Sequence, residues 1–153
     1  MESSPDQCTI AESEMLTYTD MAKGYEAHQQ RQMALSAFGK ELARRCKSKC
    51  ELTGASGVSL HIYEIPPVPE EPDLARCIMI SEDSIQQISQ PELIIPDQWH
   101  HLGELIWSEV PAVQIMAWRI LQHIADKEKW ARDILEDAYL DEEILAAAGE
   151  ATL

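Results

Sequence analysis

Two short motifs have the residue spacing of a zinc site. The first is Cys50-Glu-Leu-Thr53, followed by Gly54, and the second is Ser81-Glu-Asp-Ser84. Two thiolates three residues apart can grip one tetrahedral zinc ion, and two such pairs complete its coordination. Only Cys50 is a thiol here, because the other three positions carry hydroxyls, which are poor zinc ligands beside thiolates. The motifs predict a vestigial metal site at Cys50, Thr53, Ser81 and Ser84, without bound zinc.

Another combination of side chains leaves a rebuilt metal site open. It would use Cys46, Cys50 and Cys77 together with His61. Cys46 and Cys50 are four residues apart, a spacing that places two side chains on one face of a helix. Free cysteines are commonly buried as small apolar residues, and we favour that role over a rebuilt site.

The elements that hold the two motifs follow from the apolar pattern. Leu35, Phe38 and Leu42 recur at steps of three and four residues, which predicts a helix. Val58 to Ile65 carries apolar residues with polar ones mostly between them, as a half-buried strand does. Two glycines predict a tight turn before this strand, and the dense prolines after it block both helix and central strand. The expected order is a helix over residues 25–46, a strand over 58–65 and a loop over 66–72. A second strand over 77–80 and one or two helical turns over 82–89 follow.

The C-terminal half is expected to be helical. Asp97 can cap a helix that runs through Ile106, and Ser108 can cap the next helix, whose first turn tolerates Pro111. That second helix has an apolar stripe formed by Val113, Met116, Ala117, Ile120 and Ile124. Two further helices are expected to start at Asp126 and Asp141.

Together these elements predict the α+β class. A small zinc-ribbon-like β knuckle is expected between an N-terminal helix and a C-terminal helical segment. Residues 1–22 lack a sustained period and are rich in Ser, Thr, Asp and Glu, which is typical of a mobile tail. The predicted organisation is a flexible tail at residues 1–22 and an N-terminal helix at 23–47. A degenerate zinc-ribbon-like module, the knuckle, follows at 48–90, and a helical region at 91–153.

Four stretches within roughly residues 40 to 148 carry a family resemblance. They are CELTGASGVSLHIYEIPPVP, IMISEDSIQQI, LIWSEVPAVQIMAWRIL and WARDILEDAYLDEEILAAA. With these stretches the chain resembles the PhnA family of zinc-ribbon proteins. In the family, the first stretch begins Cys-Glu-Leu-Cys-Gly and continues into a Tyr-Glu-Val-Pro-Pro run. The resemblance implies that Thr53, Ser81 and Ser84 stand where the family has zinc-binding cysteines. It also implies that this chain lacks the β-barrel domain of the longer members.

Charge and composition narrow the class of partner. The formal net charge is -15, which disfavours generic nucleic-acid binding because such a surface repels phosphates. No window approaches the roughly 18 to 20 apolar residues of a membrane span. The N-terminus has neither the basic region nor the apolar core of a signal peptide, so we expect a cytoplasmic protein with reduced cysteines.

Five cations interrupt the acidic chain and form a basic cluster. They are Lys40, Arg44, Arg45, Lys47 and Lys49. The plain interpretation is the solvated end of a helix, where cations also suit the dipole. If the cluster is an interface, it would bind an acidic groove of a partner protein or the acidic face of a second copy of the chain. Within one chain, it could instead be covered by Glu136, Asp137, Asp141, Glu142 and Glu143. Exposed ion pairs contribute only about 0 to 1 kcal/mol each to stability. Replacing Arg44 and Arg45 by Glu, which reverses their charge, is therefore expected to change the fold stability little.

The functional expectation is a non-enzymatic interaction or regulatory protein with a vestigial metal site, of the PhnA-like kind. No catalytic residue is assigned, and the expected partner is an unidentified protein or a second copy of the chain. The alternative is a metal-binding protein or an enzyme-associated factor linked to phosphonate metabolism. That alternative rests on the name of the family that the chain resembles, and a fold does not carry a function with it.

Overall fold

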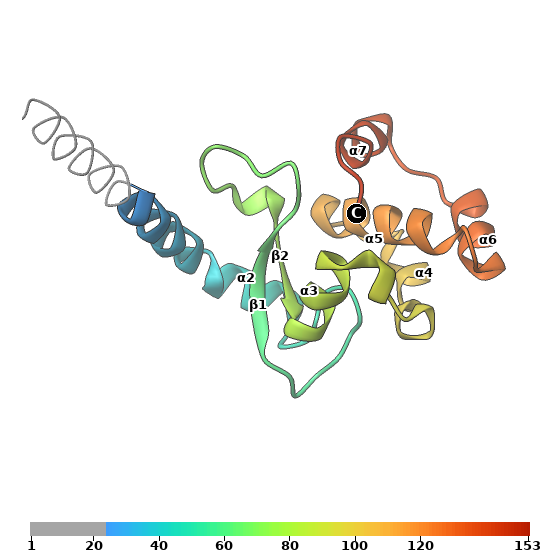
Figure 1. The fold of residues 1–153 in the computed structure, drawn as a ribbon, viewed down its shortest axis with the longest axis horizontal. Coiled ribbons are helices and arrows are strands. Elements are labelled where there is room, and N and C mark those ends of the chain that lie inside the picture. The colour runs from blue at the N-terminus through green and yellow to red at the C-terminus, as the bar shows by residue number, and fades with distance from the viewer. Residues whose placement is uncertain (1–23) are drawn as a thin grey trace, which may run out of the picture. The chain divides into compact units, whose positions relative to one another are not determined.

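The computed structural model describes residues 24–153, which belong to two compact units divided between Ala37 and Phe38 (Figure 1). Residues 24–37 of the first unit are helical. The second unit, residues 38–153, contains every other helix and strand described below. The predicted tail at residues 1–22 lies outside the described residues.

The predicted helix over residues 25–46 is interrupted at Phe38, which lies in a turn. Helix α2 (Gly39–Cys46) follows this turn and packs against strand β2. Leu42 and Cys46 are buried on it, four residues apart, as expected for an apolar helix face. The helix ends at Lys47, whose left-handed backbone turns the chain toward Cys50.

A two-stranded antiparallel sheet forms the centre of residues 48–90, the segment that we call the knuckle, as predicted. Strand β1 (Leu60–Glu64) pairs with β2 (Cys77–Ser81), so that Leu60 faces Ser81 and Glu64 faces Cys77. All five residues of β2 are buried, whereas β1 is half-buried. Gly54 and Gly57 have positive φ angles, which confirms the predicted turn before β1. The proline-rich segment is a loop, and it leads into a short 3-10 turn, η1 (Leu74–Arg76).

Helix α3 (Glu82–Ser89) starts directly after β2, and it matches the helical turns predicted there. Two 3-10 turns, η2 (Pro91–Leu93) and η3 (Pro96–Trp99), then lead to the short helix α4 (Leu102–Leu105).

The single helix predicted from Asp97 to Ile106 is therefore wrong. Pro96, and not Asp97, opens η3, and the Asp97 side chain makes no capping hydrogen bond. Trp99 is buried at the end of η3, where its indole donates to Gln87 of α3, and the turn residues His100 and His101 separate η3 from α4.

Three helices complete the second unit. Helix α5 (Pro111–Ile124) packs against α4, α6 (Lys129–Asp137) and α7 (Glu142–Ala148). Every member of the predicted α5 stripe is buried. Helix α5 begins after Val110 and not after Ser108, although Ser108 Oγ accepts a hydrogen bond from the Val110 N–H. Helix α6 starts three residues later than predicted, at Lys129.

One apolar core joins the knuckle to the helices, and this confirms the α+β class. It takes Leu52, Ile78 and Ile80 from the knuckle side and Leu102, Met116 and Ile120 from the helical side. Each buried aliphatic side chain contributes about 1.5 to 3 kcal/mol relative to exposure. The knuckle is thus held by packing against α4 and α5. Among the described residues, no helix is long and apolar enough to cross a membrane.

Candidate functional site

A tight turn brings the first motif together. The Cys50 N–H donates to the Ala55 carbonyl at 2.9 Å, and the Gly54 N–H donates to the Cys50 carbonyl at 2.8 Å. Gly54 has a φ of 76°, in the left-handed region that favours glycine. The Thr53 hydroxyl accepts from the Ala55 N–H at 3.4 Å. The turn therefore brings Thr53 back toward Cys50.

The second motif meets the first at the end of β2. Ser81 is the N-cap of α3, and its hydroxyl accepts from the Ser84 N–H at 3.2 Å. The Ser81 hydroxyl also donates to the Ser84 hydroxyl at 2.9 Å. Cys50 Sγ lies 3.5 Å from Ser84 Oγ and accepts from the Ser81 N–H at 3.4 Å. The four positions singled out in the sequence therefore form one hydrogen-bonded group, which we call the knuckle cluster.

Hydrogen bonds lower the pKa of the Cys50 thiol in this cluster. Burial raises the pKa of Cys50, but hydrogen bonds from the Thr53 and Ser84 side chains, and from the Ser81 and Leu52 backbone, lower it. The net pKa lies below its ordinary value. Donors around a sulfur favour its thiolate form. Cys50 is only 2% exposed, so its sulfur is not presented to solvent as a nucleophile.

The alternative metal site is not assembled. Cys46 Sγ donates to the Ala43 carbonyl at 3.6 Å, and Cys77 Sγ donates to the Asp73 carbonyl at 3.3 Å. His61 is exposed on β1. Within residues 24–153, no three His, Cys, Asp or Glu side chains are grouped to hold a metal ion. The rebuilt site that the sequence left open is therefore not supported by the fold.

A cavity of about 620 Å³ borders the knuckle cluster. Thr53 and Ser81 contribute to its wall, together with Glu82, Asp83 and Gln98. The His101 ring covers the other side of the turn, where a Cβ at Gly54 would lie 3.5 Å from His101 Nε2. The cavity wall thus offers hydroxyl, carboxylate and amide groups.

The basic cluster divides into two parts. Lys40, Arg44, Lys47 and Lys49 are exposed, and none makes an ion pair within the described part of the chain. We call these four residues the basic patch. Arg45 is different, because its side chain is only 27% exposed and is turned inward.

Arg45 and Glu51 form a structural ion pair. Arg45 Nε and Nη2 donate to the two Glu51 oxygens at 2.9 and 2.8 Å, and Nη2 also reaches the Cys77 carbonyl at 2.9 Å. Glu51 Oε1 accepts the Met79 N–H at 2.9 Å, and the Glu51 side chain is 6% exposed. This bidentate pair joins the end of α2 to β2 through the knuckle turn. The expectation that Arg45 could be reversed at little cost in stability is not supported by this geometry.

Lys47 and Ser48 are the two non-glycine residues with positive φ in the described chain, at 52° and 62°. A side chain in this region costs roughly 1 kcal/mol or more, and glycine avoids that strain. We expect Lys47→Gly to raise the free energy of unfolding by about 0.5 to 1 kcal/mol, after the loss of chain entropy is allowed for.

Thermal or urea unfolding of three variants checks this expectation. Lys49→Gly is the matched control, because Lys49 has no positive φ and should lose about 0.5 to 1 kcal/mol instead. Lys47→Ala keeps the strain and should bring no gain in stability. Equal destabilisation by both glycine variants would contradict the left-handed conformation of Lys47.

Two buried polar residues were not found from the sequence. The Gln87 amide donates to Asp83 and Gln98, at 2.9 and 2.7 Å, and its oxygen accepts from the Ile95 N–H and the Trp99 indole, at 3.0 and 2.9 Å. The i,i+4 spacing of Asp83 and Gln87 was the only sequence signal for this network.

Arg119 is the second residue that the sequence did not reveal. It is 3% exposed on α5, and its guanidinium donates to the Ala148 and Ala147 carbonyls, each at 3.0 Å. Burial lowers its pKa from the ordinary value. Its position among the apolar residues of α5 gave no sign of the partner, because α7 lies almost 30 residues further along the chain.

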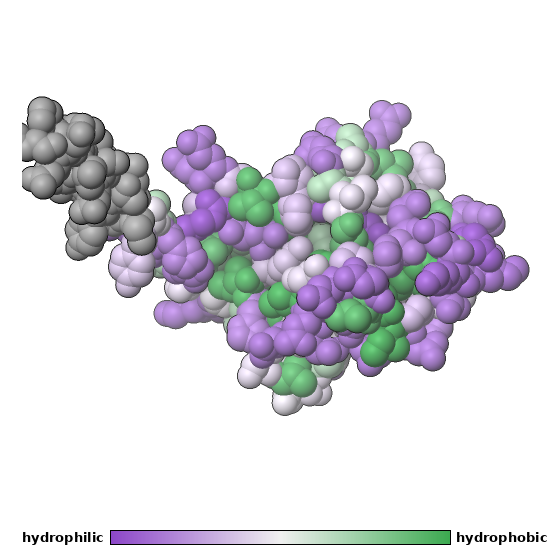
Figure 2. All heavy atoms as spheres, viewed as in Figure 1, coloured by the Kyte–Doolittle hydropathy of each residue, from purple (hydrophilic) through white to green (hydrophobic). Residues whose placement is uncertain are grey.

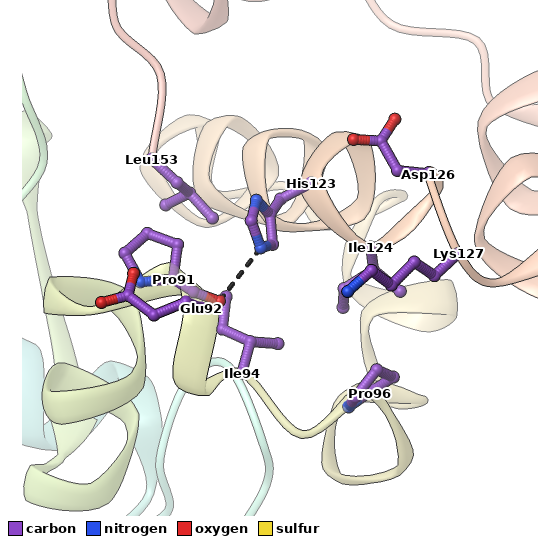
Figure 3. Close-up of a pocket in the computed structure, with 9 residues that line it drawn as sticks. All are labelled: Pro91, Glu92, Ile94, Pro96, His123, Ile124, Asp126, Lys127 and Leu153. Atoms are coloured by element: carbon purple, nitrogen blue, oxygen red, sulfur yellow. Dashed lines mark hydrogen bonds between the residues drawn. The ribbon is translucent and has the colours of Figure 1, made fainter.

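Another cavity, of about 480 Å³, lies between the end of α5 and the loop before α4 (Figure 3). His123 Nε2 lies 3.0 Å from the Pro91 carbonyl, and the two residues meet at the wall of the cavity beside Leu153. Lys127 and Asp126 line the opposite end. Because the imidazole is already paired with a carbonyl, it links α5 to η2 and is not directed at a ligand.

Comparisons of the chain with models of known protein families, with curated proteins and with solved structures found no match in any of the three.

Proposed function

We propose that the chain is a non-enzymatic interaction or regulatory protein of the PhnA type. The observation that carries the proposal is the knuckle cluster, in which side chains from both motifs meet and hydrogen-bond to one another. The proposal places the protein in the cytoplasm, where its cysteines stay reduced. Cys46, Cys50 and Cys77 are free thiols within residues 24–153, which is compatible with that compartment.

Zinc does not fit the residues that stand in the cluster. A structural zinc site takes four thiolate or imidazole ligands, and the cluster offers one thiol and three hydroxyls. The hydroxyls of Ser81 and Ser84 bond to each other, and Cys50 bonds to both residues. The shared apolar core supports a knuckle that folds without a metal, because Leu52 and Ile80 are fully buried in it.

The proposed interaction role rests on the exposed basic patch. The basic patch is exposed on a chain whose net charge is -15, and its cations make no ion pair among the described residues. An isolated basic surface on an acidic protein favours partners of complementary potential and repels others. We therefore propose that the patch is the docking surface.

Affinity capture from the native host tests this function. We expect the tagged wild-type protein to retain a partner that is lost when Arg44→Gln and Lys47→Gln are combined, because complementary charges dominate such an encounter. The matched control is Lys127→Gln with Lys129→Gln, which changes the net charge equally outside the patch. Retention of the same partner by both variants would contradict the docking surface, and the absence of any binding partner, including a second copy, would contradict an interaction protein.

A further inference from the structure

The fold separates the basic patch from the acidic residues that could have covered it. Glu136 and Asp137 end α6, and Asp141, Glu142 and Glu143 begin α7; all five are exposed, and we call them the acidic patch. Helix α2 packs against β2, whereas α6 and α7 pack against α5. Helices α2 and α6 lie at opposite ends of the second unit (Figure 1). The two patches therefore do not neutralise each other within one chain.

The acidic patch is unfavourable for the helix that carries part of it. Glu136 and Asp137 stand in the last turn of α6, where no basic residue is present. Carboxylates at a helix C-terminus are repelled by the negative end of the dipole, by roughly 0.3 to 1 kcal/mol each. A cation brought from outside would relieve that repulsion. Figure 2 shows hydrophilic side chains gathered over the end of the unit where α6 lies.

The basic patch likewise contains a cation without an ion-pair partner among the described residues. Lys47 occupies a left-handed position that favours glycine, and its side chain makes no ion pair among the described residues. Lys40 and Arg44 are four residues apart on α2, so they project from one face of the helix. Each patch thus contains charges, Lys47 in one and Glu136 and Asp137 in the other, that make no ion pair among the described residues.

We propose that the basic patch of one chain docks on the acidic patch of a second copy, head to tail. The inference deepens the proposed function by naming its partner surface. Repeated head to tail, this contact joins two different surfaces and generates either a closed ring or an open row of copies. An antiparallel twofold dimer would also pair each basic patch with an acidic patch, but it would stop at two copies.

The dependence on salt follows from the charges. The net charge of -15 makes two copies repel at long range, and this repulsion is strongest at low ionic strength. At about 0.15 M salt the Debye length is about 8 Å. Salt then screens the long-range repulsion between the two net charges more than the attraction between two patches in contact. At about 1 M it is about 3 Å, and the patches are screened as well. Association should therefore be strongest at intermediate salt.

Sedimentation velocity of the full chain over a range of concentrations tests the proposal. Wild-type protein should associate at about 0.15 M salt and dissociate at about 1 M. Arg44→Gln with Lys47→Gln should weaken the association by about tenfold or more, and Glu136→Gln with Asp137→Asn should do the same. A mixture of these two variants retains one intact patch of each kind, and it should form dimers and nothing larger.

Three outcomes would overturn the proposal. They are a wild-type protein that is monomeric at every salt concentration, variants that associate like the wild type, and a mixture that does not pair. Lys127→Gln with Lys129→Gln is the control for net charge and should not weaken association. Circular dichroism of each variant separates lost docking from lost folding. A monomeric protein that still captures a host partner through the basic patch would overturn only the head-to-tail contact and leave the proposed function standing.

Discussion

Replacing Thr53, Ser81 and Ser84 together by cysteine should convert the knuckle cluster into a zinc site with about one zinc per chain. Tetrahedral Zn–S bonds of about 2.3 Å place two sulfurs about 3.8 Å apart. Cys50 Sγ and Ser84 Oγ are already 3.5 Å apart, and Ser81 Oγ and Ser84 Oγ are 2.9 Å apart. Small movements of the new sulfurs would therefore complete the coordination. Elemental analysis of the wild type should show no stoichiometric zinc.

The thermal effect of this change should be large. Zinc at about a thousand times its dissociation constant would stabilise the variant by about 4 kcal/mol. For a chain of this size, that raises the Tm by about 8 to 16 °C relative to the same variant in a chelator. The wild-type Tm should be the same with and without EDTA, because its knuckle is held by the apolar core and hydrogen bonds.

The control for the zinc variant is the same triple substitution with Cys50→Ser, which removes one of four thiolates and should reduce zinc affinity sharply. A triple variant that folds but takes up no zinc would show that the two motifs do not have ribbon geometry. Stoichiometric zinc in the wild type would instead contradict the vestigial site. It would favour a metal-binding protein or an enzyme-associated factor linked to phosphonate metabolism.

Arg45→Ala should destabilise the protein far more than Arg44→Ala, although the two residues are adjacent in one basic cluster. Removing Arg45 leaves the Glu51 carboxylate, 6% exposed, with the Met79 N–H as its remaining hydrogen-bond donor. Breaking a buried pair costs about 3 to 5 kcal/mol, and the partial exposure of Arg45 reduces this to about 2 to 3 kcal/mol. Denaturant unfolding should show this loss for Arg45→Ala and a change within about 0.5 kcal/mol for Arg44→Ala.

Two further variants separate charge from geometry in this pair. Arg45→Lys keeps the charge but cannot donate from a planar fork, so its stability should lie between those of the wild type and Arg45→Ala. Glu51→Gln removes the buried charge and keeps the shape, so it should be less harmful in an Arg45→Ala background than alone. Equal stabilities of Arg44→Ala and Arg45→Ala would contradict the inward position of Arg45.

The parts of the fold that follow a local pattern could be predicted from the sequence. The α5 stripe is continuous from Val113 to Ile124, and the boundaries of α3 follow from the transition between a buried strand and a polar first turn. The knuckle turn follows from the two glycines that take positive φ angles. The positions of the knuckle cluster also came from spacing, although Ser81 was interpreted only as a lost ligand. Its second role, as the N-cap of α3, uses the same hydroxyl.

The remaining features depend on contacts that no local pattern reveals. Arg45 meets Glu51 only because the left-handed residues after α2 reverse the chain. The helix predicted at Asp97 is divided into the 3-10 turn η3 and the short helix α4, and the Trp99 indole at the end of η3 donates to Gln87 on another element. Charge clustering alone could not distinguish Arg45 from Arg44, since both are near the end of the same helix and differ only in which neighbour they face.

The buried guanidinium of Arg119 has a consequence for how the C-terminal segment can move. It donates to the last two carbonyls of α7, and the guanidinium would lose both of these acceptors if the short helix detached. A seven-residue helix would ordinarily fray independently of its neighbours. Here its release would break two hydrogen bonds to a guanidinium that is 3% exposed, at a cost of about 1.5 to 3 kcal/mol each. We therefore expect helix α7 to unfold together with α5, so that the acidic residues at its start, Asp141, Glu142 and Glu143, are held by the same cooperative folding unit.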